Sequence, residues 1–244
     1  MRDRSGRGWR KRPLIMLGAA LVLLLLAACV SDATSDVAVT LKPTQFAANG
    51  EAAPTVVVIG DSISTGYQTS AEDAWPTRLQ QKLSAEGNPI TLVNAAENGA
   101  GYLVEGDGGK TFEQQAATAV PSQAQLVVVY GSENDIGADL GQISAQVENT
   151  ATAVKAKAPQ ATLLFVGPAA YGSDVDPDLL SIRDQIKAGA QGVGAEFVDP
   201  IEEHWIMDDK ADLIGPDGDH PTVAGHVYLE QKFEALVTPL LLSN

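Results

Sequence analysis

The chain has 244 residues, of which 45% are hydrophobic and 19% charged, which is ordinary for one globular domain with a sizeable core. Acidic residues outnumber basic ones by 31 to 16, so the formal net charge is −15. This acidity argues against nucleic acid as a partner, because phosphate groups are bound by Lys and Arg. No segment of about 20–50 residues repeats, which excludes a solenoid.

Residues 1–28 have the pattern of an export signal. Residues 2–12 contain six basic residues and one acid, and an uncharged apolar run follows from Leu14 to Ala28. A basic start, an apolar centre and small residues before a cleavage point are typical of a signal peptide. The run is shorter than the about 20 residues of an ordinary membrane-spanning helix. Cleavage would leave 10 basic and 30 acidic residues, a net charge of −20.

The signal ends in Leu26-Ala27-Ala28-Cys29, which resembles the lipobox of bacterial lipoproteins. The resemblance implies that Cys29, the only cysteine, is lipidated and holds an extracytoplasmic protein at the cell membrane. A plain signal peptide cut near Ala28 and an uncleaved anchor are the alternatives. We expect residues 29–53 to be the lipid anchor and a flexible tether, although Val37–Leu41 could instead form an edge strand.

Residues 54–244 are expected to form the folded domain, because β-branched apolar runs alternate there with longer helical stretches. The expected strands are Thr55–Ile59, Ile90–Val93, Leu126–Tyr130, Thr162–Val166 and Glu196–Val198, and the expected helices are 74–86, 111–120, 138–157, 178–192 and 221–240. Continuous apolar runs suit strands that are buried on both faces of a parallel sheet. The alternation predicts an α/β sandwich with a flavodoxin-like parallel sheet of about five strands.

In such a sheet the functional site lies at the carboxyl ends of the strands. The first expected strand leads into Gly60-Asp61-Ser62-Ile63. A serine at a tight turn from strand to helix can act as a nucleophile, and nearby backbone N–H groups can face a developing oxyanion. The alternative is a helix N-cap, for which Ser and Asp are preferred residues.

Two further segments follow the next two expected strands. Asn94 to Gly99 contains a glycine whose backbone N–H can approach a substrate closely, although a lone glycine can equally mark a flexible loop. Asn134 lies in Gly131-Ser132-Glu133-Asn134-Asp135, where its amide can donate to an oxyanion or form an Asx turn.

The segment Asp217-Gly218-Asp219-His220-Pro221 precedes the last expected helix. A histidine can accept the proton of a serine, and an acid fixes its tautomer. Asp217 can fold back to reach Nδ1, whereas Asp219 is placed awkwardly next to the histidine. A solvated turn is the alternative. The other histidines, His204 and His226, are too scattered to indicate a zinc site, so no metal is expected.

Together these segments resemble the SGNH (GDSL) hydrolase family from about Pro54 onward. The sequence G-D-S-I at 60–63 matches its first block, Asn94 to Gly99 its second, Asn134 its third, and D-G-D-H-P at 217–221 its fifth. The resemblance implies a three-layer α/β/α fold without metal or organic cofactor. It also implies Ser62, Asp217 and His220 as catalytic residues, with Ser62, Gly99 and Asn134 forming the oxyanion hole.

One departure concerns the third block, which is usually written G-x-N-D. Here Ser132 stands where glycine is usual, which puts the local backbone in question more than the role of Asn134.

The resemblance implies an exported serine hydrolase that cleaves carboxylic esters, such as acyl or acetyl groups of glycans or lipids, through an acyl-enzyme. The alternative is a non-catalytic or acyl-transferring domain that binds acylated cell-surface glycans. An intact set of Ser62, Asp217 and His220 disfavours a pure binding protein. The ester itself and the oligomeric state cannot be read from the sequence, because the loops around 67–74, 102–110, 169–177 and 202–216 carry no recognisable code.

Overall fold

The computed structural model describes residues 52–207 and 212–243. The expected signal peptide, Cys29 and the alternative strand Val37–Leu41 lie outside the described residues. The strands are β1 (Thr55–Gly60), β2 (Thr91–Asn94), β3 (Ala124–Tyr130), β4 (Thr162–Val166) and β5 (Glu196–Val198). The helices are α1 (Ser62–Thr65), α2 (Trp75–Ala85), α3 (Phe112–Ala119), α4 (Ile143–Lys157), α5 (Pro177–Gly192) and α6 (Val223–Leu242), with short 3₁₀ helices η1 (Glu133–Asp135) and η2 (Leu140–Gln142).

The five strands form one parallel sheet in the order β2-β1-β3-β4-β5. This order is that of the flavodoxin-like sheet, in which the chain reverses direction across the sheet next to β1. The expectation of a flavodoxin-like parallel sheet is therefore confirmed.

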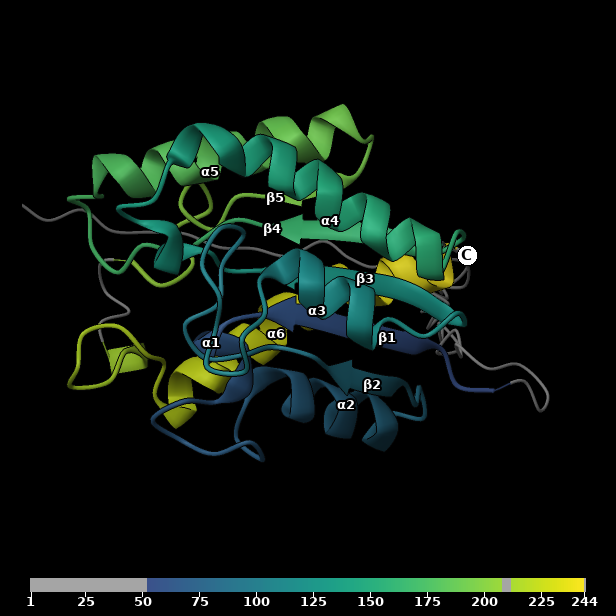
Figure 1. Ribbon diagram of the computed structural model, residues 1–244. Coiled ribbons are helices and arrows are strands. Elements are labelled where there is room, and N and C mark those ends of the chain that lie inside the picture. The colour runs from purple at the N-terminus through teal and green to yellow at the C-terminus, as the bar shows by residue number, and fades with distance from the viewer. Residues whose placement is uncertain (1–51, 208–211, 244) are drawn as a thin grey trace, which may run out of the picture. The chain divides into compact units, whose positions relative to one another are not determined.

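Helices cover both faces of this sheet, as Figure 1 shows. Val57 and Ile59 of β1 belong to an apolar cluster with residues of α3, α4 and α5, whereas Val56 and Val58 belong to a cluster with α2 and α6. Successive side chains of a strand point to opposite faces, so one uninterrupted valine run supplies both cores. The three-layer α/β/α arrangement is thus confirmed.

Aromatic side chains fill the core between the sheet and helices α2 and α6. Trp75 stacks on Phe233 with ring centroids 3.7 Å apart, and Trp205 meets Phe233 edge-on at 5.6 Å. Trp205 is fully buried, so this residue belongs to the core. Edge-to-face and stacked pairs add to the free energy gained from burying such large side chains.

Expectations about three elements are wrong. The runs at 90–93 and 196–198 were expected to be buried on both faces, yet β2 and β5 are partly exposed because they form the two edges of the sheet. The helix expected from residue 138 begins at Ile143, because residues 140–142 form the 3₁₀ helix η2 instead.

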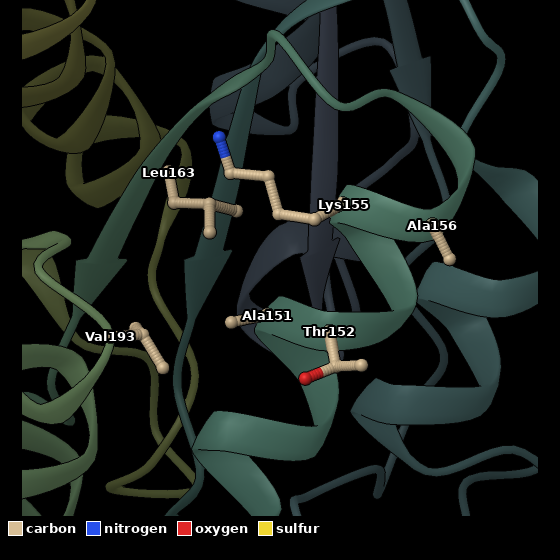
Figure 2. A pocket seen from close by; sticks show the side chains of 6 residues that line it. All are labelled: Ala151, Thr152, Lys155, Ala156, Leu163 and Val193. Atoms are coloured by element: carbon tan, nitrogen blue, oxygen red, sulfur yellow. The ribbon is translucent and has the colours of Figure 1, made fainter.

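The two ends of the parallel strands have different surroundings. At their amino-terminal ends, Leu163 at the start of β4 and Val193 after α5 line a cavity of about 360 Å³ together with Ala151 and Lys155 of α4 (Figure 2). No residue of the expected site lines that cavity. The residues expected to be catalytic all lie beyond the opposite, carboxyl ends of the strands. Among the helices of residues 52–207 and 212–243, none is long and apolar enough to cross a bilayer.

Candidate active site

The site begins where β1 gives way to the short helix α1. Asp61 caps this helix by accepting a hydrogen bond from the N–H of Ile63 at 3.0 Å, and Gly66 ends it with a φ of 83°. Ser62 is the first residue of α1. Asp61 is therefore the N-cap residue that the alternative interpretation of this motif predicted. The side chain of the adjacent serine is free for other contacts.

Ser62, His220 and Asp217 form one hydrogen-bonded chain across 158 residues of sequence. His220 Nε2 lies 3.0 Å from Ser62 Oγ, and His220 Nδ1 lies 2.9 Å from Asp217 Oδ2. A carboxylate only accepts hydrogen bonds, so Nδ1 carries the proton and donates it to Asp217. In the neutral ring Nε2 is then an acceptor that faces the serine hydroxyl.

The geometry distinguishes the two candidate acids on either side of Gly218. Asp219 Oδ2 lies 3.7 Å from His220 Nδ1, beyond hydrogen-bonding distance, whereas Asp217 is within it. Asp217 Oδ1 also accepts the backbone N–H groups of His220 and Asp219. These contacts, led by the backbone N–H of His220 and then its ring, lower the pKa of Asp217 to about 2. Asp217 is therefore ionised at neutral pH.

Each residue expected to form the oxyanion hole has a hydrogen-bond donor to offer. Within the described residues, the backbone N–H groups of Ser62 and Gly99 have no protein acceptor. Gly99 has a φ of 75°, and a Cβ atom placed on it would meet nothing within 4 Å, so this turn borders open space. Asn134 Nδ2 donates to the carbonyl of Ala100 at 2.9 Å, which leaves its second N–H available.

Residues of the second block, Asn94 to Gly99, are hydrogen-bonded to α1 and to the end of β1. Asn94 Nδ2 donates to the carbonyl of Ser64 at 2.7 Å, and the hydroxyl of Thr65 donates to Asn98 Oδ1 at 2.6 Å. The N–H of Glu97 also donates to the carbonyl of Gly60. The serine and the turn at Gly99 are thus held together by three hydrogen bonds between segments far apart in the sequence.

Ser132, the departure from the third block, occupies a backbone conformation that favours glycine. Its φ is 104°, yet it is fully buried and its hydroxyl donates to Asp135 Oδ2. Asp135 is also fully buried and accepts the backbone N–H groups of residues 102–104 at 2.8–3.1 Å. The serine hydroxyl thereby supplies a fourth donor to a buried carboxylate, which offsets part of the backbone strain.

Asp61 links the first and third blocks. Its Oδ2 accepts the backbone N–H of Ser132 at 3.2 Å, and its carboxylate fills the space that a side chain on Gly131 would need. Burial raises the pKa of Asp61 to about 6, against the lowering effect of the N–H groups of Ile63 and Ser132. From the sequence, Asp61 is expected only as a possible helix cap.

Gln115 is a second residue whose role in the site was not predicted from the sequence. This buried side chain of α3 bonds both backbone groups of Gly60: its Oε1 accepts the N–H and its Nε2 donates to the carbonyl, each at 3.0 Å. It therefore fixes the last residue of β1 before the serine turn. The only available signal was a polar residue on the otherwise apolar face of α3.

The surroundings of His220 are acidic and partly aromatic. The ring of Tyr67, which is 45% exposed, lies 4.8 Å from the His220 ring. Burial and the neighbouring charge of Asp219 raise the pKa of Glu133, which contacts Asp219. In the ranges 52–207 and 212–243, no three His, Cys, Asp or Glu residues are grouped so as to hold a metal ion.

The other two histidines lie apart from this site. His226 is fully buried within α6, where neither ring nitrogen has a hydrogen-bond partner among residues 52–207 and 212–243, and burial lowers its pKa to about 4. His204 lies in the loop after β5 with a φ of 51°.

A flavodoxin-like sheet with a hydrogen-bonded serine, histidine and aspartate at its carboxyl edge defines an α/β protein of the hydrolase class. The chain belongs to the GDSL-like Lipase/Acylhydrolase family, whose model matches residues 58–228. Family membership confirms the resemblance drawn from the motifs, and the protein is a carboxylic ester hydrolase.

Relatives support this assignment over most of the domain. The chain is 42% identical over 188 residues to "GDSL lipase Rv0518" of Mycobacterium tuberculosis, covering 75% of this chain and 81% of that protein. It is 30% identical over 195 residues to "Esterase TesA" of Pseudomonas aeruginosa, covering 78% and 90% respectively. A crystal structure of TesA superimposes with a TM-score of 0.62 at 23% identity over 76% of this chain and 99% of that one.

Proposed function

We propose that Ser62, His220 and Asp217 are the catalytic residues of an exported ester hydrolase that works through an acyl-enzyme. The observation that carries this proposal is the hydrogen-bonded chain from Ser62 Oγ through both nitrogens of His220 to Asp217. A neutral histidine whose Nδ1–H is fixed by a carboxylate presents a free lone pair at Nε2. That is the arrangement a general base needs for a serine hydroxyl.

In the first half-reaction His220 Nε2 takes the hydroxyl proton while Ser62 Oγ attacks the ester carbonyl carbon. The carbonyl oxygen becomes an oxyanion that accepts hydrogen bonds from the N–H groups of Ser62 and Gly99 and from the amide of Asn134. The tetrahedral intermediate then expels the alkoxide, which takes the proton from His220 and leaves as the alcohol. In the second half-reaction a water molecule attacks the acyl carbonyl carbon while His220 takes its proton. The bond from the acyl carbon to Ser62 Oγ then breaks, Oγ takes the proton from His220, and the acid is released.

The test is hydrolysis of p-nitrophenyl acetate by residues 30–244 and by the variants Ser62→Ala and Ser122→Ala. Ser122 lies in an exposed position before β3, at the opposite edge of the sheet, and serves as the matched control. We expect Ser62→Ala to lose nearly all activity and Ser122→Ala to keep it. A mass increase of one acyl group on the peptide containing Ser62 after rapid acid quench would reveal the acyl-enzyme. Full activity of Ser62→Ala would refute the proposal.

The expected substrates are acyl or acetyl esters of glycans or lipids outside the cytoplasm. The same assay with ethanol or glycerol as competing acceptors separates hydrolysis from acyl transfer. Water is the expected acceptor, and formation of new esters in preference to free acid would indicate a transferase.

We also propose that the protein is a lipoprotein with its anchor on Cys29. The basic residues 2–12, the apolar run Leu14 to Ala28 and the lipobox-like tetrapeptide support this. Expression of the whole chain and of Cys29→Ala in a bacterium, followed by membrane fractionation and mass analysis of the amino-terminal peptide, tests it. We expect the parent protein in the membrane fraction with a diacylated Cys29 and the variant without lipid; an unmodified Cys29 in the parent would refute the anchor.

A further inference from the structure

The connection between β2 and α3 contains a glutamate that the reaction described above does not use. Glu97 stands two residues before Gly99, and its side chain is only 14% exposed. The connection folds back on itself beside α1 (Figure 1), so that its glycine-rich segment, residues 105–110, lies against Glu97. Groups 13 residues apart in the sequence are therefore in contact.

The Glu97 carboxylate binds the glycine-rich segment through both of its oxygens. Oε1 accepts the ammonium group of Lys110 at 2.5 Å, and Oε2 accepts the backbone N–H of Lys110 at 3.2 Å. A Cβ atom on Gly108 would lie within 2.6 Å of three atoms of this carboxylate. The segment therefore approaches Glu97 so closely that a side chain at position 108 would displace the carboxylate.

The backbone of Glu97 belongs to the turn that carries Gly99. The N–H of Ala100 donates to the carbonyl of Glu97 at 3.2 Å, which closes a four-residue turn with Gly99 at its third position. The N–H of Glu97 donates to the carbonyl of Gly60, the last residue of β1, at 3.1 Å, and the carbonyl of Ala100 accepts Asn134 Nδ2. One turn thus carries one proposed oxyanion donor, Gly99, and orients another, Asn134.

The glycine-rich segment also holds the peptide unit that supplies the Gly99 N–H. This unit contains the carbonyl of Asn98, which accepts the N–H of Asp107 at 2.9 Å. Because a trans peptide is planar, its N–H points opposite to its carbonyl. The hydrogen bond from Asp107 therefore fixes the direction of the Gly99 N–H.

We infer that Glu97 is a positioning residue that holds the glycine-rich segment on the turn and so fixes the direction of the Gly99 N–H. This inference rests on the proposed function, in which Gly99 and Asn134 donate to the oxyanion. Turns of types I and II differ mainly in the orientation of the middle peptide, here the one between Asn98 and Gly99, and the φ of 75° at Gly99 is that of type II. Release of the segment frees this peptide to turn over, which points the N–H away.

The effect of such a release falls on the transition state. An oxyanion is stabilised by donors that are already in place, because a donor that first has to reorient loses part of its effect. A neutral ester carbonyl gains little from the same N–H group. Loosening the turn therefore lowers kcat and leaves KM almost unchanged.

The test combines kcat and KM for p-nitrophenyl acetate with the inhibition constant Ki of an alkyl trifluoromethyl ketone. In the inhibited enzyme Ser62 Oγ bonds to the ketone carbon, His220 takes the serine proton, and the ketone oxygen becomes an oxyanion. Ki therefore reports how well the donors are placed. Unlike the measured kcat, it does not depend on which fraction of a preparation is folded.

Glu97→Ala removes both hydrogen bonds to Lys110. Its matched control is Glu86→Ala, because Glu86 also pairs with a lysine, Lys82 of α2. We expect Glu97→Ala to lower kcat by about tenfold or more, to raise Ki by a similar factor and to change KM by less than about twofold. Glu97→Gln keeps an acceptor for the backbone N–H of Lys110 and should lose less than Glu97→Ala, while Glu86→Ala should match the parent.

Gly108→Ala tests the same contact from the other side and covers the case in which Glu97→Ala does not fold. The new Cβ displaces the Glu97 carboxylate, and it does so at an exposed position without a positive φ, where alanine is otherwise tolerated. We expect the same fall in kcat and the same rise in Ki. Gly141→Ala is the control, since its Cβ would meet nothing closer than Asp139 Oδ1 at 3.5 Å.

Unchanged kcat and Ki in Glu97→Ala and Gly108→Ala would overturn the inference. A fall in kcat without a rise in Ki would also overturn it, because Glu97 would then only stabilise the fold. A rise in KM at constant kcat would mean that Glu97 contacts the bound substrate instead. Failure of the proposed function is seen separately, since Ser62→Ala would then hydrolyse p-nitrophenyl acetate at the parental rate.

Discussion

At the scale of single residues, the amide of Asn134 donates one N–H group to the carbonyl of Ala100 and keeps a second N–H, which we propose donates to the oxyanion. Replacement by alanine removes a donor that an oxyanion needs and a neutral carbonyl does not. We expect Asn134→Ala to lower kcat by about 10²–10³ and to change KM by less than about twofold. Steady-state kinetics with p-nitrophenyl acetate measures this, with the exposed Asn149→Ala on α4 as control. A rise in KM at constant kcat would mean that Asn134 binds the substrate and not the transition state.

Asp217 and Asp219 provide a second comparison at this scale, because they flank one glycine and differ by less than 1 Å in their distance to His220 Nδ1. Only Asp217 fixes the tautomer in which Nε2 accepts the serine proton. Asp217→Asn should lower kcat by about 10³–10⁴, whereas Asp219→Asn should change it less than about threefold. Rates measured from pH 5 to 9 check that the loss is not a shifted pH optimum. Equal losses in the two variants would contradict the assignment of Asp217.

The contacts of Asp217 and Asp61 could be predicted from the sequence because each of these residues lies within a few residues of its partner. Asp217 and His220 are three residues apart, and Asp61 caps the helix it precedes. Gln115 and Asp135 could not be assigned in this way, since they bind backbone groups 55 and 31–33 residues away. Contacts of that range depend on how the elements pack, which hydrophobic patterns do not specify to the level of one hydrogen bond.

At the scale of elements, Asp135 of η1 accepts hydrogen bonds from the backbone of residues 102–104, and Ser132, which precedes η1, donates to the same carboxylate. Ser132→Ala loses the hydrogen bond to Asp135 and keeps the strained φ, whereas Ser132→Gly loses the same bond but relieves the strain. We expect Ser132→Ala to be less stable than Ser132→Gly by about 1 kcal/mol in the free energy of unfolding. Urea unfolding of both variants at pH 7 measures the difference, and equal stabilities would show that the backbone at residue 132 is not strained.

The elements themselves were largely predictable, and the misses have physical causes. An apolar run such as Ile90–Val93 indicates a strand, but its place in the sheet depends on all the neighbouring strands. The pattern therefore predicted more burial for β2 than the structure shows. The helix expected over 138–157 begins later than predicted, at Ile143. The chain tightens at residues 140–142 into a 3₁₀ turn whose spacing the apolar pattern of α4 does not reveal.

At the scale of the whole molecule, two buried groups oppose each other in the dependence of stability on pH. Burial lowers the pKa of His226 from 6.5 to about 4, with smaller effects from Asp73, Arg78 and His220. As the pH falls from about 6.5 to 4, the unfolded chain binds a proton at this residue and the folded chain does not, so stability is lost. Burial raises the pKa of Asp61 from 3.8 to about 6. As the pH falls from about 6 to 3.8, the folded chain binds a proton there and the unfolded chain does not, so stability is gained.

Each shift corresponds to about 3 kcal/mol over its window, so the two contributions nearly cancel between pH 4 and 6. Removing one group should expose the other. We expect the unfolding free energy of His226→Leu to rise relative to that of Asp61→Asn as the pH falls from 6 to 4. Other titrating groups are common to both variants, so the difference between their unfolding free energies isolates these two residues. Urea unfolding at half-unit intervals of pH measures it, and a difference that stays constant between pH 4 and 7 would show that neither group is held in its uncharged form by burial.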